Sequence, residues 1–179
     1  MRNRAIRRRK VAEPPAIWGD DRIGAGMRLW HREFPDIDCS GKAVVGRLLH
    51  LRELFLKSVN RTLAKHRLKY PAYAVLATIR VHGPPYRMSP TALLDSLILT
   101  SGGLSNLLRK LEKAGQIRRL ADDTDGRGVI VELTELGRRI VEPAMRDHAE
   151  TERRLISALS RDEQTAVAEA LARMMLKQS

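Results

Sequence analysis

The sequence predicts a mainly α-helical protein centred on a winged helix-turn-helix with a two-stranded β wing, and with further helices at both chain ends. Aromatic residues make up only 4% of the 179 residues and hydrophobic residues 43%, which favours an aliphatic, mostly helical core. Apolar residues recur at helical spacing along most of the chain. Between residues 67 and 133, a helix, a short helix, a third helix and two strands follow one another. That order is typical of a winged helix-turn-helix.

The N-terminus is strongly basic. The first ten residues carry six Arg and Lys side chains and no acidic one, which is half of the formal net charge of +12. Because no apolar segment follows, the stretch does not match a secretory signal, and we predict a disordered, solvated arm over residues 1–17. The open alternatives are an arm that contacts phosphates and a transit peptide. The overall charge favours a polyanionic partner, nucleic acid before a membrane surface.

Several classes of protein are excluded by what the sequence lacks. No run of 18 apolar residues is present, so a membrane-spanning helix is not expected. The single cysteine, Cys39, excludes an internal disulfide and a CxxC zinc site, and a redox role for it stays open. The five histidines show no HExxH spacing, and neither a GxSxG motif nor a phosphate-binding loop occurs. We therefore expect a cytoplasmic protein that is not an enzyme and has no metal or cofactor.

A long apolar helix is predicted near the N-terminus. After a short helix over 20–33, apolar residues step by three or four along residues 41–66. One stripe consists of Val44, Leu48, Leu51, Phe55 and Val59, and a second consists of Val45, Leu49, Leu56 and Leu63. A helix with so wide an apolar face needs more contacts than a small domain offers, which indicates a subunit interface. A helix buried within its own chain is the alternative.

Capping signals place the remaining elements. Pro71 suits the first turn of a helix over 71–82, and Ser89 with Pro90 begins a short helix. The next helix, over 101–114, begins at Thr100-Ser101 and ends at Gly115. Strands follow over 117–120 and 129–133, joined by a turn with an Asp125-Gly126 hairpin signal. Thr134 caps a helix to about 157, and the capping box Ser160-x-x-Glu163 begins the last helix, to about 177.

The helix over 101–114 is the predicted reading element. Its inner stripe consists of Leu104, Leu107, Leu108 and Leu111. Its opposite face collects Gly102, Asn106, Arg109 and Lys113, flanked by Ser105 and Lys110. Asn can bond adenine edges and Arg guanine edges in the major groove. The alternative is an ordinary amphipathic helix with a solvated polar face. The ribbon that follows favours DNA, because a tip arginine, Arg127, suits a narrow minor groove.

Two stretches resemble the MarR family of transcriptional regulators. Residues 119–127 (RLADDTDGR) and 131–137 (VELTELG) look like the family's wing and following helix. Residues 99–106 (LTSGGLSN) and 111–115 (LEKAG) look like its recognition helix. The resemblance covers about residues 20–178. It implies an obligate homodimer that binds double-stranded DNA at a pseudo-palindrome, usually as a repressor released by a small ligand.

Further segments are similar to the family's urate-responsive branch, which has an extra N-terminal helix. They are Trp30 with residues 33–38 (EFPDID), and residues 83–91 (GPPYRMSPT). The four effector-binding positions of that branch read Trp30, Ala74, Leu107 and Arg119 here, so two of its polar partners are replaced. A small aromatic or anionic effector is expected. Trp30 as helix packing and Arg119 as a phosphate contact remain the alternatives.

These inferences define three regions. We expect a basic arm over 1–17, a helical dimerisation region over 18–66 plus 134–179, and a DNA-binding domain over 67–133. The expected function is a sequence-specific, ligand-released repressor. The alternatives are a ligand-independent repressor and a sequence-independent, nucleoid-type DNA binder. The predicted DNA-contacting residues are Ser89, Thr91, Ser101, Gly102, Ser105, Asn106, Arg109, Lys113, Arg119 and Arg127.

Overall fold

The computed structural model of the chain describes residues 16–121 and 128–177. It forms two compact units, Met1–Leu54 and Phe55–Ser179, whose boundary falls inside one long helix, α2 (Lys42–Ala64). The first fifteen residues of the predicted basic arm lie outside the described part. The three-region division by function stays a prediction, because compactness alone does not assign dimerisation or DNA binding to a segment.

Arg47 makes hydrogen bonds that connect several elements of the N-terminal unit. A 3₁₀ turn, η1 (Ala16–Trp18), precedes α1 (Arg22–Glu33), which Asp21 caps. Arg47 of α2 donates to the Asp21 carboxylate at 2.7 Å and to the backbone carbonyls of Ile17 and Trp18. Residues 16 and 17, the last two of the predicted arm, lie in the turn η1, and the carbonyl of Ile17 accepts one of these hydrogen bonds. The small core of the N-terminal unit consists of Trp18, Met27, Cys39 and Ala43.

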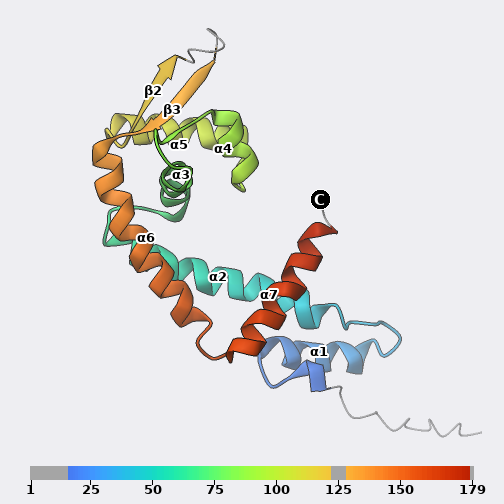
Figure 1. Ribbon diagram of the computed structural model, residues 1–179. Coiled ribbons are helices and arrows are strands. Elements are labelled where there is room, and N and C mark those ends of the chain that lie inside the picture. The colour runs from blue at the N-terminus through green and yellow to red at the C-terminus, as the bar shows by residue number, and fades with distance from the viewer. Residues whose placement is uncertain (1–15, 122–127, 178–179) are drawn as a thin grey trace, which may run out of the picture. The chain divides into compact units, whose positions relative to one another are not determined.

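The C-terminal unit contains the winged helix-turn-helix (Figure 1). Three antiparallel strands form its sheet in the order β1-β3-β2, and the predicted two-stranded wing consists of β2 and β3. The third strand, β1, was not predicted, because two residues are too few to show an alternating pattern. Its elements after α2 are α3 (Tyr70–Val81), β1 (Arg87–Met88), α4 (Pro90–Ser96), α5 (Ser101–Lys113), β2 (Ile117–Ala121), β3 (Val129–Leu133), α6 (Glu135–Leu155) and α7 (Arg161–Leu176).

The predicted helix caps are confirmed. Ser89, Thr100, Thr134 and Ser160 each accept a hydrogen bond from a backbone N–H in the first turn of their helix, and Ser160 forms the full capping box with Glu163. After α5, Gly115 takes a φ of +70°, and the amides of Gly115 and Gln116 close back on the carbonyls of Glu112 and Leu111. This is the Schellman arrangement, which ends the helix and leaves three residues, 114–116, before β2 begins.

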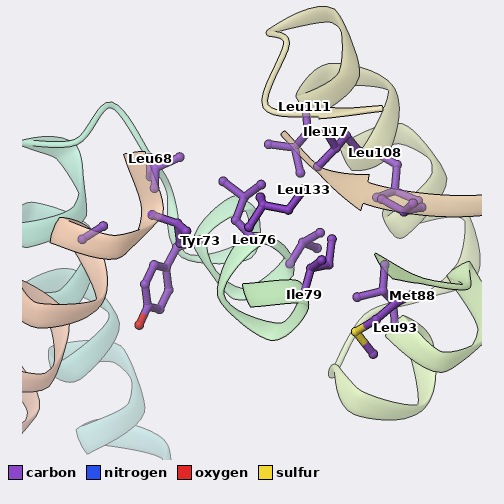
Figure 2. Close-up of a cluster of buried hydrophobic side chains, with 14 of the residues drawn as sticks. Leu68, Tyr73, Leu76, Ile79, Met88, Leu93, Leu108, Leu111, Ile117 and Leu133 are labelled. Carbon is purple, nitrogen blue, oxygen red and sulfur yellow. The ribbon is translucent and has the colours of Figure 1, made fainter. Parts of the chain in front are cut away.

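Aliphatic side chains from α3, α4, α5, the sheet and α6 meet in one core (Figure 2). Leu76 and Ile79 of α3 are fully buried at its centre, with Leu93 of α4. Leucines of α5 and Ile117, Val131 and Leu133 of the sheet lie against them. The predicted aliphatic core is thus present, and it fixes α5 against the strands of the wing.

The apolar stripes of α2 differ along its length. Val59 and Leu63, near its end, are buried in the C-terminal unit, as the intrachain alternative requires. Towards the start of the helix, apolar side chains are exposed: Val44, Val45, Leu49, Leu51 and Leu54. Helix α7 contains no buried residue at all. Both surfaces are therefore exposed in the single chain.

Candidate nucleic-acid interface

Helix α5 presents a polar, basic face to solvent. Leu104, Leu108 and Leu111 are buried on its inner side. At about 100° per residue, Gly102, Asn106, Arg109 and Lys113 fall within about 60° of one another on the outer side. All of these outer residues are exposed, as are Ser101 and Ser105 at the edge of the face. The structure therefore brings six of the ten predicted DNA-contacting residues to one accessible helix face.

Two further predicted residues lie at the start of α4. The Ser89 hydroxyl oxygen accepts a hydrogen bond from the Ala92 amide at 3.2 Å and so caps the helix, while its O–H remains available as a donor. Thr91, the second residue of α4, is exposed. Ser89 thus has a structural role that any contact with a phosphate would have to share.

The wing supplies the last two predicted residues. Arg119 on β2 forms an ion pair with Glu112 of α5, with 3.4 Å between Nε and Oε2. Glu112 is the single acidic residue of α5, so this pair removes the one negative charge from the helix while tying it to β2. Arg127 at the wing tip lies outside the described residues.

Glu132 of β3 pairs with two arginines, an arrangement that the sequence analysis missed. Its carboxylate accepts hydrogen bonds from Arg118 on one side and Arg87 on the other. The Arg118 guanidinium, followed by that of Arg87, lowers the pKa of Glu132, against the opposing effect of burial. The alternation of buried Val131 and Leu133 around Glu132 was a signal that this side chain faces outwards. Its two partners could not be found without the register of β1.

The four predicted effector positions lie in both units. Trp30 is exposed on α1, with the Lys42 ammonium 4.2 Å from its ring centroid. Ala74 on α3 and Leu107 on α5 are half-buried, and Leu107 packs against the main core. Arg119 is paired with Glu112 as described above. Of the four, Leu107 therefore has a packing role and Arg119 an ion-pair role within the C-terminal unit, whereas Trp30 is exposed.

A separate cavity of about 330 Å³ lies in the N-terminal unit, lined by Trp18, His31, Cys39 and neighbouring residues of the loop 35–40. No residue of the predicted effector set lines it. Over the described ranges, no group of three or more His, Cys, Asp and Glu side chains could hold a metal ion. Of the helices within those ranges, none is long and apolar enough to cross a membrane.

The fold and its basic outer face define a winged helix-turn-helix DNA-binding protein. Residues 68–129 match the model of the MarR family. The chain is also 31% identical to the HTH-type transcriptional regulator PecS of Dickeya dadantii over 148 residues, which cover 83% of this chain and 89% of PecS. The chain belongs to the MarR family of transcriptional regulators, whose members are DNA-binding regulators and not enzymes.

Solved structures show the same fold. A mutant MarR from E. coli complexed with operator DNA is 25% identical, with a TM-score of 0.67, and the match covers 82% of this chain and 97% of that one. BpsR of Bordetella bronchiseptica, whose DNA binding is regulated by 6-hydroxynicotinic acid, is 21% identical, with a TM-score of 0.68 over 75% of this chain and 94% of that one. The predicted fold class is therefore confirmed.

Proposed function

We propose that this protein is a homodimeric repressor that binds a pseudo-palindromic operator, with its two α5 helices in successive major grooves on one face of the duplex. The wings would reach the flanking minor grooves, where Arg127 would act. As a chromosomal DNA binder, it would work in the cytoplasm. In this arrangement the DNA-contacting set is that predicted from the sequence, from Ser89 to Arg127.

The outer face of α5 carries this proposal. It combines an amide, Asn106, and two cations, Arg109 and Lys113, on one exposed helix face, and the leucines opposite hold the helix rigidly on the core. Asn and Arg can each make paired hydrogen bonds to a base edge. Lys113 at the end of the helix adds charge for the phosphate backbone.

The dimer is proposed from the uncovered apolar surfaces at both chain ends. The first half of α2 exposes a row of aliphatic side chains, and α7 exposes Val167, Met174 and Leu176. Residues 18–66 plus 134–179 would form the dimerisation region and residues 67–133 the DNA-binding domain. Membership of a family in which dimers are typical supports this assignment.

Competition binding tests whether the protein reads sequence. We expect the protein to prefer DNA from its own promoter over random DNA by roughly 10³ or more at physiological salt. Arg109→Ala and Asn106→Ala should lower this ratio, whereas Arg61→Ala, which removes an exposed cation from α2, should not. A ratio near one would favour the sequence-independent, nucleoid-type binder instead.

Ligand control is the second part of the proposal. BpsR shows that this fold can couple DNA binding to a small aromatic acid. We infer an effector of that chemistry, with Arg119 as the contact for its anionic group. Because Ala74 and Leu107 replace polar partners, its surroundings would be less polar than those in the urate-responsive branch. The effector would act by binding better to the form that cannot engage DNA.

A ligand screen tests this second part. Phenolic and purine ligands would be added to the protein, and both its melting temperature and its release from operator DNA would be measured. A ligand that does both should lose its effect in Arg119→Ala. If none of the compounds changes either quantity, the protein is better described as a ligand-independent repressor.

A further inference from the structure

One carboxylate on the wing holds two arginines from the strands on either side. In the sheet, Glu132 of β3 lies directly opposite Arg87 of β1 and directly opposite Arg118 of β2. Its Oε2 accepts from Arg87 Nε at 3.0 Å, and its Oε1 accepts from Arg118 Nη2 at 2.6 Å. Directly opposed residues of antiparallel strands project to the same side of a sheet. The three side chains therefore form one row across the outer side of the sheet.

The burial of the row increases towards its centre. The side chain of Glu132 is 13% exposed, whereas Arg87 is 42% and Arg118 is 60% exposed. Each arginine uses one N–H on the carboxylate, and a guanidinium has five. Within the described ranges neither arginine binds another acceptor, so most of their donors can bind a second anion, and the row as a whole keeps one net positive charge.

The row also lies where the sheet connects to the helix-turn-helix, α4 and α5. β1 leads through Ser89 directly into α4, and β2 follows α5 after the Gly115 turn. A shared carboxylate between Arg87 and Arg118 therefore holds one cation just before α4 begins and one just after α5 ends. Free arginine side chains lose considerable rotamer entropy when they bind a ligand, and a cation that is already held loses less.

We propose that Glu132 is a positioning residue that holds Arg87 and Arg118 for contact with DNA phosphates on the wing side of the operator. This inference rests on the proposed function, since it needs DNA at the α5 face. Neither arginine belongs to the set predicted from the sequence. The opposite possibility is that Glu132 merely masks two cations and weakens DNA binding.

The two possibilities predict opposite signs for Glu132→Gln. Removal of an acidic charge alone should tighten binding to a polyanion, whereas loss of positioning should weaken it. We expect the Kd for operator DNA to rise by about fivefold to tenfold, because the Gln amide is uncharged and offers one acceptor oxygen in place of two, so it cannot hold both arginines. The matched control is Glu169→Gln on α7, which makes the same charge change beside a single exposed arginine, Arg173. The control should bind as well as the wild type or slightly better.

The salt dependence of binding separates phosphate contact from a purely structural role. Arg118→Ala and Arg87→Ala should each lower the slope of log Kobs against log salt concentration by about one, the loss of one phosphate contact. Arg118→Lys should keep the slope. Because Arg118 is largely exposed, its variants should fold, and thermal melting would verify this. A stabilising role alone would lower the melting temperature and leave the slope unchanged.

Failure of this inference can be told apart from failure of the proposed function. Tighter operator binding by Glu132→Gln, or unchanged salt slopes in both alanine variants, would overturn the positioning role while Arg109→Ala still weakened binding. If Arg109→Ala also bound like the wild type, DNA would not lie on the α5 face, and both proposals would fall.

Discussion

Helices α5 and α7 both carry apolar side chains, but only α5 has them covered by its own chain. Leu104, Leu108 and Leu111 of α5 are buried, and the side that remains outside is polar and basic. In α7 no residue is buried, and Val167, Met174 and Leu176 are exposed. The difference is that the apolar side of α5 is covered within the chain and its exposed side is polar, whereas the apolar side chains of α7 remain exposed.

The largest expected effect comes from shortening a buried leucine of α5. Leu108→Ala should lower the free energy of unfolding by about 2–5 kcal/mol, because it leaves a cavity among well-packed side chains. Met174→Ala on α7 should change the stability of the isolated subunit far less. Urea unfolding, measured for α7 variants at subunit concentrations below the dimer dissociation constant, checks this contrast. Equal losses for both variants would show that α7 is covered within its own chain.

A smaller effect is expected from charging the uncovered side of α7. Met174→Asp should weaken the dimer at least about tenfold, since burial of the new carboxylate would be unfavourable, while the helical content stays the same. Thr165→Asp, on the side of the same helix opposite Met174 and about three turns before Leu176, is the matched control. Sedimentation velocity over a concentration series measures the change. Dimers of equal strength for both variants would place the interface elsewhere.

Gly102→Ala tests the exposed side of α5. A Cβ at this position would meet no atom of the protein within 4 Å, so the fold does not require glycine there. The substitution should stabilise the helix by up to about 1 kcal/mol, yet weaken DNA binding, because the added methyl group stands where DNA must approach. Denaturant unfolding and operator titration would be run on the same samples. A gain in stability with unchanged affinity would show that DNA does not approach this residue closely.

Gly24 is the contrasting position, at the start of α1. Its Cβ would lie 1.8 Å from the backbone oxygen of Trp18, which cannot move aside as a flexible side chain would. Gly24→Ala should therefore lower the melting temperature of the protein. The fold thus requires glycine at position 24 but not at position 102.

The smallest expected effect is the pH dependence of stability caused by Glu132. Its pKa is lowered in the folded protein by Arg118 and Arg87, so its ion pairs stabilise the fold above the ordinary Glu pKa. This contribution is lost as the pH falls through the lowered value. Between neutral pH and about pH 3, the wild type should therefore lose more stability than Glu132→Gln. Parallel curves for the two proteins, measured by urea unfolding, would contradict the assignment.

Much of the fold could be predicted from local signals. The caps at Ser89, Thr100, Thr134 and Ser160 involve neighbouring residues only, and the leucine spacing of α5 requires only a regular helix. Strand β1 and the contacts of Arg47 could not be predicted, because their partners are far along the chain and no local pattern marks them. The same reason hid Arg87, Arg118 and Glu132, whose common row exists only once three strands are in register.

The amino-acid sequence on its own determined which segments are helices, where they begin and end, and which side of α5 faces the core. These depend on hydrogen bonds and apolar spacing within a few residues. Only the tertiary structure decided which apolar surfaces the chain covers for itself, as in α5 and the end of α2, and which it leaves exposed, as in α7. Burial depends on contacts between distant segments, and hydrophobicity along the chain is the same whether a partner helix is present or not.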